Sequence, residues 1–232
     1  MSVSTHTPFS LPIPNIICQT FCMRKLTATL CLTIAVLLRS AGVSWSADTI
    51  YPSGAPEIGS EFGSYIGING RDREDAHQGI DITGKEGQEI LAVADGTVLE
   101  ATVEKCWGPT IAVDHGNGID GNKIIALYGH VGEMLVAEGD VVERGQIIAR
   151  LGNNQYNFEC IWGVRHLHFQ IGQKYRDRFN KGTYWGHSYF LEDGGEGINP
   201  HLYWADGPNK VTCFESSKKY KRGTITYPVP CR

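Results

Sequence analysis

The sequence predicts a mostly β protein, an antiparallel β-sandwich or curled sheet that carries loops at its rim. Three observations in the 232-residue chain lead to this class. Short apolar, β-branched runs alternate with turn residues from about residue 59 to residue 172. Glycine is frequent, at 28 residues, and it separates these runs. No amphipathic pattern in this region is long enough for a helix of three turns.

The residues before position 48 are expected to lie outside the fold. Residues 23–47 combine Arg24 and Lys25 with an uncharged run of 13 residues and a small-residue end, a pattern typical of a secretory signal peptide. That run is short of the roughly 20 residues that a membrane-spanning helix needs. We therefore expect cleavage near Ala47, no stable membrane anchor afterwards, and a periplasmic or secreted product. Residues 1–22 are either a disordered prefix or the result of a start codon assigned too early.

Residues 48–172 are expected to form the main domain from short strands. The runs on either side of Asp95-Gly96 predict a tight hairpin, because this dipeptide favours a two-residue turn. The stretch TIAVDHGNG ends a strand in turn residues, and VAEGDVVERGQIIARLG gives short strands separated by glycine. The latter segment also resembles the hairpin of lipoyl- and biotin-carrier domains. No lysine lies at its tip to carry a cofactor, which argues against that class.

Residues 173–232 are expected to form a loop-rich, aromatic C-terminal extension. Their charge is opposite to that of the main domain, with ten Lys and Arg against six Asp and Glu, whereas residues 48–172 have eight against nineteen. The extension is expected to pack beside the acidic domain, to face an anionic polymer, or to cover a sheet edge. The formal net charge of −4 indicates no nucleic-acid partner. No pattern indicates an oligomeric state.

Four cysteines follow the predicted signal peptide: Cys106, Cys160, Cys213 and Cys231. An even number in an exported protein predicts disulfides, and three pairings are possible. The preferred pairing joins Cys213 to Cys231, which closes the extension, and Cys106 to Cys160 in the main domain. A zinc site made of thiolates is the weaker alternative, because these four contain no C-x-x-C pair.

Two histidines interrupt the apolar run GVRHLHFQI at positions 166 and 168. Residues i and i+2 of a strand face the same side, so His166, His168 and Gln170 share one face and the apolar residues between them face the core. A single histidine on a strand is usually a half-buried residue without a special role. Two on one face indicate a site.

The stretch HQGIDI places His77 and Asp81 four residues apart. Both residue types bind divalent ions, but on a straight strand their side chains would be about 13 Å apart. Gly79 permits a turn that would bring them together. With one of His166 or His168 they make three ligands of the types that zinc prefers, and a fourth position stays open for water, as in catalytic zinc sites.

Considered by itself, His130 in LYGHV would be interpreted as a turn residue. Together with the histidine of the H-x-H pair that does not bind metal, it would place two imidazoles beside a metal-bound water. Two such rings can remove a proton from the water and stabilise a tetrahedral oxyanion. The chemistry that these residues predict is amide hydrolysis.

The motifs HQGIDI, LYGHV and HLHFQI, in this order, resemble the signature of the lysostaphin-type zinc metallopeptidases, also called murein endopeptidases. The resemblance extends from about Phe62 to Ile171. It implies that His77, Asp81 and His168 bind one zinc ion (Zn2+) per chain. It also implies that His166 and His130 are catalytic, with His166 as general base and His130 as oxyanion stabiliser, or with these two roles exchanged. The implied fold is largely antiparallel β, and the implied substrates are peptides of bacterial peptidoglycan.

The resemblance therefore predicts a secreted zinc metalloendopeptidase that hydrolyses peptide bonds in peptidoglycan through a metal-activated water. The alternative is a non-catalytic module that binds the cell wall or activates murein hydrolases. All five metal and catalytic positions are intact, whereas family members that only activate other enzymes have typically lost some of them. Two segments depart from the family, NNQYNFECIWGVR and GIDGNKI, and both are expected to reshape the groove walls.

Five other histidine or tyrosine residues receive simpler predictions. His115 is expected to be a turn residue at a strand end. His187 and His201 are expected to serve packing or hydrogen bonding in the extension. Tyr65 and Tyr128 either line the groove or are buried with a bonded hydroxyl, and burial is favoured for both.

Overall fold

A computed structural model of the protein describes residues 48–173, 175 and 197–232. The predicted prefix 1–22, the predicted signal peptide 23–47 and His187 lie outside the described residues. The described residues all belong to one compact unit. Among the described residues, none of the helices has the length and apolar character to cross a membrane.

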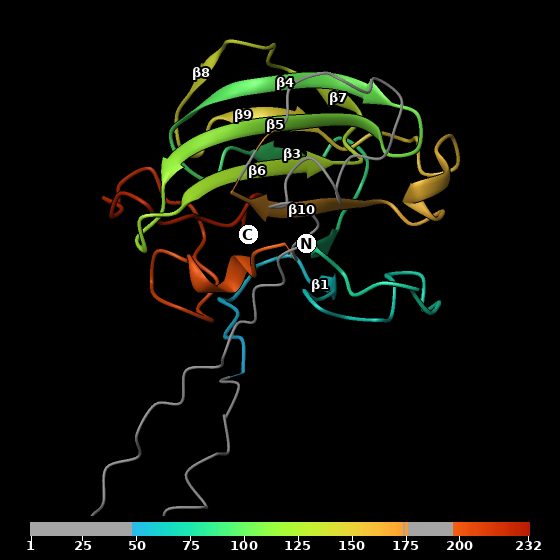
Figure 1. Cartoon of the computed structure of the whole chain (residues 1–232), viewed down its shortest axis with the longest axis horizontal. Coiled ribbons are helices and arrows are strands. Elements are labelled where there is room, and N and C mark those ends of the chain that lie inside the picture. Colours follow the sequence, from blue (N-terminus) through green and yellow to red (C-terminus); the bar gives the residue numbers. More distant parts are fainter. Residues whose placement is uncertain (1–47, 174, 176–196) are drawn as a thin grey trace, which may run out of the picture. The chain divides into compact units, whose positions relative to one another are not determined.

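The described residues form two antiparallel sheets, which confirms the predicted mostly β class (Figure 1). The larger sheet has seven strands in the order β1 (Ile58–Ser60), β2 (Gly79–Thr83), β10 (His166–Gly172), β6 (Lys123–Gly129), β5 (Gly108–Asn117), β4 (Gly96–Glu104) and β8 (Val141–Val142). The smaller sheet has three, in the order β3 (Glu89–Leu91), β9 (Ile147–Arg150) and β7 (Glu133–Met134). The helices are two short 3-10 turns, η1 (Glu159–Ile161) and η2 (Pro200–Leu202).

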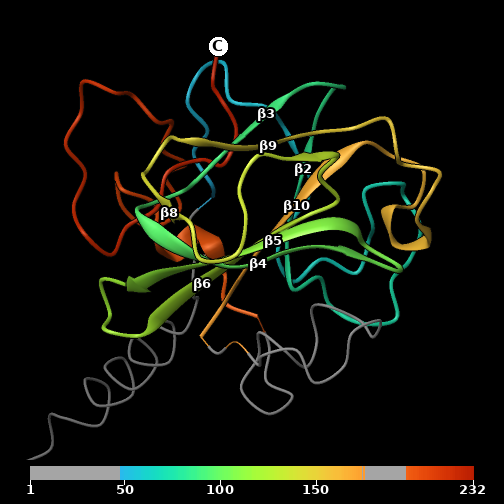
Figure 2. The same ribbon diagram turned by 90° about the horizontal axis from the view of Figure 1, so that it is seen from above.

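The main core lies between the two sheets, and β3 and β9 form a second layer beside β4 and β5 (Figure 2). Ile90 and Ala149 of the smaller sheet join one buried cluster with Val98 and Ile111 of the larger. Burying each large aliphatic side chain contributes about 1.5–3 kcal/mol. The apolar residues of β10 belong to the same cluster, as their alternation with the histidines predicts.

The hairpin predicted at Asp95-Gly96 is wrong. β3 pairs with β9 and β4 pairs with β5 and β8, so the dipeptide connects two sheets and does not turn one strand back on another. Gly96 has no left-handed φ angle. The glycine instead permits close packing, because a Cβ at this position would lie 2.7 Å from the carbonyl oxygen of Asp114. The Asp95 carboxylate accepts a hydrogen bond from the backbone N–H of Arg144, which fixes the connection.

The described part of the C-terminal extension, residues 197–232, is built into the core. Trp204, Ile225 and Tyr227 belong to the main buried cluster. The segment also covers the edge of the smaller sheet, because the N–H of Leu91 donates to the carbonyl of Pro228. Both preferred disulfides are present, Cys106–Cys160 and Cys213–Cys231, with Cα separations of 5.1 and 5.9 Å.

Candidate metal centre

Three motifs that are far apart in the sequence meet because β10 lies between β2 and β6. In the register of these strands, His168 is opposite Asp81 on β2 and opposite Gly129 on β6. His130 follows Gly129 with a left-handed φ of 66°, a conformation in which histidine is one of the commoner non-glycine residues. The sheet therefore brings the H-x-H strand between the other two motifs.

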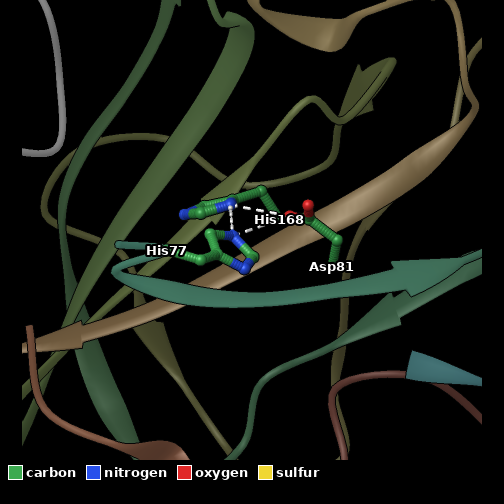
Figure 3. Close-up of side chains that lie close together, drawn as sticks. All are labelled: His77, Asp81 and His168. Atoms are coloured by element: carbon green, nitrogen blue, oxygen red, sulfur yellow. Dashed lines mark hydrogen bonds and ion pairs between the residues drawn. The ribbon is translucent and has the colours of Figure 1, made fainter. Parts of the chain in front are cut away.

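His77, Asp81 and His168 form a tight buried group (Figure 3). Nε2 of His77 lies 3.1 Å from Oδ1 of Asp81, and Nδ1 of His168 lies 2.8 Å from the same oxygen. The two ring nitrogens are 3.1 Å apart. Among the described residues this is the group whose donor atoms could hold a metal ion.

The hydrogen bonds of the two rings determine which nitrogen is free. Nδ1 of His77 lies 3.0 Å from the carbonyl oxygen of Glu61, which only accepts, so this nitrogen carries the proton. Nε2 of His168 lies 3.1 Å from Oε1 of Gln170 and donates to it in the same way. Each ring therefore presents an unprotonated nitrogen to the Asp81 carboxylate. Three acceptors facing one another at this spacing repel unless a cation lies between them.

The donor set fits a small divalent ion. Zinc takes histidine nitrogen and carboxylate oxygen at about 2.0–2.2 Å, so two ligands of a tetrahedral ion lie about 3.3 Å apart. The three donor atoms are 2.8–3.1 Å apart, within a few tenths of an ångström of that spacing. The ring nitrogens that face away from Asp81 are hydrogen-bonded to Glu61 and Gln170. Metal-binding histidines are usually oriented by such a second hydrogen bond.

The electrostatics of the group favour an ionised carboxylate and a neutral His168. Burial by itself raises the pKa of Asp81, but His166, His168 and His77 outweigh it and hold that pKa well below its usual value. Burial lowers the pKa of His168, although Asp81 opposes the shift. Both states are those in which the side chains bind metals.

The two predicted catalytic histidines lie beside this group. Nε2 of His166 is 3.6 Å from Oδ1 of Asp81, and its Nδ1 donates to the carbonyl of Val164 at 2.7 Å. Nδ1 of His130 donates to the carbonyl of Trp107 at 2.9 Å, and the two rings have centroids 4.8 Å apart. Burial, then the charges of His166 and His168, lower the pKa of His130 well below its usual value. All five predicted site residues are thus together.

The role predicted for Gly79 is wrong. Gly79 begins β2 in extended conformation and pairs with Gln170, so the chain does not turn there. His77 lies before the strand, and this position allows its ring to reach Asp81. The glycine instead makes room for β10, because a Cβ would lie 2.5 Å from the carbonyl oxygen of Phe169 and 3.0 Å from Nε2 of His168.

Arg73 is a site residue that the sequence did not reveal. Its Nη2 lies 2.7 Å from Oδ2 of Asp81, on the side of the carboxylate away from the two rings, and its guanidinium lies 4.7 Å over the ring of Trp162. Arg73 stands in the charge run RDRED, and nothing in the spacing separates it from the exposed Arg71. Only its position, four residues before the predicted ligand His77, could have indicated that Arg73 lies near the site.

Two tryptophans form walls beside the group of His77, Asp81 and His168. Trp107 packs against His168 with ring centroids 4.7 Å apart. Trp162 comes from the segment NNQYNFECIWGVR, which reaches the groove as predicted. The disulfide Cys106–Cys160 joins the chain beside Trp107 to the chain near Trp162. A cavity of about 150 Å³ between them is lined by Ile68, Arg73, Asp81, Trp107, His130, Cys160, Trp162, His166 and His168.

The segment GIDGNKI does not reach the groove, contrary to the prediction. Its Asp120 accepts a hydrogen bond from the hydroxyl of Tyr203 at 2.6 Å, and the N–H of Ile119 donates to the carbonyl of Gly223. The insertion therefore packs on the C-terminal extension. The reason is that it forms the turn between β5 and β6, at the end of these strands away from His130.

The remaining predicted histidines and tyrosines that the structure describes do not line this cavity. Tyr128 is fully buried with a bonded hydroxyl, as favoured, whereas Tyr65 is 60% exposed and does not line the cavity. His115 lies near the end of β5 and bonds the Tyr128 hydroxyl, so it is a strand residue and not a turn residue. His201 is buried and hydrogen-bonded, as predicted, to Glu61 of the main domain and to Trp204 of the extension.

Known proteins match part of this chain. Curated relatives include Stage II sporulation protein Q of Bacillus subtilis, 30% identical over 40% of this chain and 31% of that protein. Murein hydrolase activator NlpD of Escherichia coli is 34% identical over 44% of this chain and 24% of that protein. Endolysin 2638A of Staphylococcus phage 2638A is 34% identical over 42% of this chain and 19% of that protein. The chain thus spans less than a third of the length of these relatives.

Among solved structures, the catalytic domain of the peptidase lysostaphin from Staphylococcus simulans is 24% identical, covers 62% of this chain and 89% of its own, and has a TM-score of 0.43. The family model of peptidase family M23 matches residues 75–181, a range that contains all five predicted site residues. The motifs predicted a lysostaphin-type peptidase, and the match of residues 75–181 to peptidase family M23 agrees with that prediction.

Proposed function

We propose that this chain is an exported zinc-dependent endopeptidase that hydrolyses peptide bonds in bacterial peptidoglycan. The observation that carries the proposal is the convergence of His77, Asp81 and His168 on one point, with two further imidazoles beside it. A structural zinc site is normally closed by four protein ligands, whereas three ligands leave a position for water. Two neighbouring histidines add the proton-transfer groups that hydrolysis needs.

His77, Asp81 and His168 would hold the ion. When bound, zinc would supply a water of lowered pKa and would polarise the substrate carbonyl. His166 is our proposed general base, because its Nδ1 proton is engaged by Val164 and its Nε2 is therefore free to accept a proton beside the ligand group. A positioned general base contributes about 10²–10⁴-fold to a rate.

His130 is our proposed oxyanion stabiliser. Its Nδ1 proton is engaged by the carbonyl of Trp107, so Nε2 has no proton to donate while the ring is neutral. The ring has to take up a proton at Nε2 before it can donate to an oxyanion. His166 and His130 share the same tautomer, and this symmetry is the physical reason why their roles can be exchanged.

The substrate class is supported by the relatives and by the groove. An endolysin and a murein hydrolase activator are among the matched proteins, and both names refer to the bacterial cell wall. The cavity beside the metal centre is walled by Trp107 and Trp162, and flat aromatic walls suit an extended peptide. The two disulfides suit the oxidising environment outside the cytoplasm.

The proposal is tested by metal analysis and by turbidity loss of a cell-wall suspension. We expect about one zinc per purified chain, clearing of the suspension, loss of clearing with a chelator, and recovery when zinc is added back. Mass spectrometry of the released muropeptides would then identify the bond that is cut. A chain that holds zinc but releases no new amino termini from the wall would refute the enzymatic proposal.

A second candidate is a module that activates other murein hydrolases, because one relative at 34% identity bears that name. This candidate predicts no clearing by the chain alone and faster clearing when a murein amidase is present. Substitution of His166 separates the two. It abolishes the enzymatic effect and leaves an activating effect unchanged.

A further inference from the structure

The loop that carries His77 is enclosed by two segments from opposite ends of the described chain. Residues 61–64 hold its backbone, since the N–H of His77 donates to the carbonyl of Ser64 and the N–H of Gly63 donates to the carbonyl of His77. The carbonyl of Glu61 accepts the ring proton at Nδ1. This last bond directs Nε2 toward Asp81. The orientation of this metal ligand thus depends on where the Glu61 carbonyl lies.

Glu61 is in turn held by its side chain. One carboxylate oxygen accepts from the hydroxyl of Tyr51, and the other lies 2.8 Å from Nε2 of His201. His201 is 140 residues away in sequence and comes from the C-terminal extension, which appears below the sheet in orange (Figure 1). Glu61 thus connects the extension to the backbone carbonyl behind His77.

The tautomer of His201 is determined by a neighbour in the core. The indole N–H of Trp204 donates to Nδ1 of His201 at 2.9 Å, so Nδ1 is the acceptor and Nε2 carries the proton that Glu61 receives. Trp204 is 1% exposed and packs against Tyr227, so it is part of the rigid core. Hydrogen bonds therefore join Trp204 to His201 and His201 to the Glu61 carboxylate, and the covalent side chain of Glu61 connects this carboxylate to the carbonyl that accepts from His77.

A second contact from the extension reaches the other side of the same loop. The N–H of Gly197 donates to the side-chain carbonyl of Gln78, the residue after His77. The approach is close, because a Cβ on Gly197 would lie 2.4 Å from the backbone oxygen of Gln78. The extension thus contacts the loop both through Glu61 and at Gln78.

From these contacts we propose that His201 is a positioning residue for the metal ligand His77, so that the C-terminal extension is a working part of the metal centre. The proposal deepens the proposed function and rests on it, since it concerns the same metal site. His201 acts through Glu61 and touches neither metal nor substrate. Its proton fixes the Glu61 carboxylate, and with it the carbonyl that selects the Nδ1-protonated tautomer of His77.

A purely structural role for His201 predicts a different outcome, and the extension offers a matched control. Tyr203 lies two residues away, is also buried, and also bonds a carboxylate, that of Asp120. Its contact leads to the β5–β6 turn and not to the metal site. Tyr203→Phe therefore removes a comparable hydrogen bond from the same segment without affecting His77.

The first measurement is zinc affinity, by competition with a chelator, for wild type, His201→Ala, His201→Gln and Tyr203→Phe. We expect an affinity about tenfold lower for His201→Ala, at the low end of the range for outer partners of metal ligands. His201→Gln keeps an N–H that can reach Glu61 and should recover most of the affinity. Tyr203→Phe should bind zinc as wild type does. Equal affinities for His201→Ala and Tyr203→Phe would overturn the proposal.

The second measurement needs no metal and separates this proposal from the proposed function. Ring-nitrogen chemical shifts of His77, measured by NMR on metal-free protein with 15N-labelled histidine, report which nitrogen carries the proton. We expect Nδ1 of His77 to be protonated in wild type and Tyr203→Phe, and a population that lacks the Nδ1 proton in His201→Ala. An unchanged tautomer in His201→Ala overturns the proposal, even if the wild type proves to bind no zinc.

Discussion

Nδ1 of His168 lies 2.8 Å from Oδ1 of Asp81, the residue directly opposite it in the register of β10 and β2. Two of the three proposed metal ligands therefore stand on adjacent strands whose backbone hydrogen bonds set their separation. Sites built on strands are held more closely than sites on loops. His77 alone comes from a loop, and residues 61–64 hold both its backbone and its ring.

Replacement of Asp81 by asparagine is expected to remove metal binding. The substitution keeps the shape of the side chain but removes the charge that faces two ring nitrogens and Arg73. Loss of a ligand should lower zinc affinity by more than the 10–100-fold seen for outer partners. Metal content after dialysis, measured by mass spectrometry, checks this. Full retention of zinc by Asp81→Asn would show that the three residues do not form the site.

Replacement of His166 by glutamine is expected to separate binding from turnover. His166 is not among the three converging ligands, so the variant should hold zinc as wild type does. Its rate of wall hydrolysis should fall by about 10²–10⁴-fold, because the proposed general base is lost. Zinc content and release of amino groups from purified walls are measured on the same sample. Normal hydrolysis by this variant would assign the base elsewhere, with His130 as the next residue to test.

Replacement of Arg73 by methionine is expected to weaken zinc binding by about 10–100-fold, because Arg73 bonds the Asp81 oxygen that faces away from the rings and so orients the carboxylate. The matched control is Arg71→Met, which removes the same charge from an exposed position two residues earlier. Both variants are compared with wild type by chelator competition. An affinity that is unchanged or higher in Arg73→Met would show that Arg73 repels the ion more than it orients Asp81.

His115 is expected to make stability dependent on pH in the acidic range. Its Nδ1 donates to the carbonyl of Asp95, and its Nε2 accepts from the Tyr128 hydroxyl, so the folded protein requires the neutral ring. Burial lowers the pKa of His115 from 6.5 to about 4. The folded pKa is below the unfolded one, so the unfolded chain binds more protons between these values. The stabilising contribution is complete above about pH 6.5 and is lost as the pH falls toward 4.

This dependence is measured by urea unfolding of metal-free protein between pH 7.5 and 4.5. The free energy of unfolding of wild type should fall more steeply than that of His115→Gln, by up to about 1.4 kcal/mol per pH unit, since one proton is involved. Parallel curves for the two proteins would mean that His115 keeps its ordinary pKa in the folded state.

The convergence of His77, Asp81 and His168 could be predicted because the motifs that carry them are short, local stretches of sequence. Alternation in β10 places His166 and His168 on one face, and the motif order then matches the family. The pairing of strands is not local, so the Asp95-Gly96 prediction failed: the dipeptide suits a hairpin, but its neighbours found partners in different sheets. Arg73 could not be predicted for a similar reason, because its contacts are also not local in the sequence. Its partner Trp162 is 89 positions later and belongs to a segment that departs from the family.

The disulfide between Cys106 and Cys160 has a consequence for how a substrate enters. It joins the two tryptophan-bearing walls of the groove covalently, close to the reacting centre. Because the bond lies beside the cavity, it limits how far the two walls can separate. For the endopeptidase proposed above, we expect a groove of nearly fixed width that selects slim peptide segments over folded proteins.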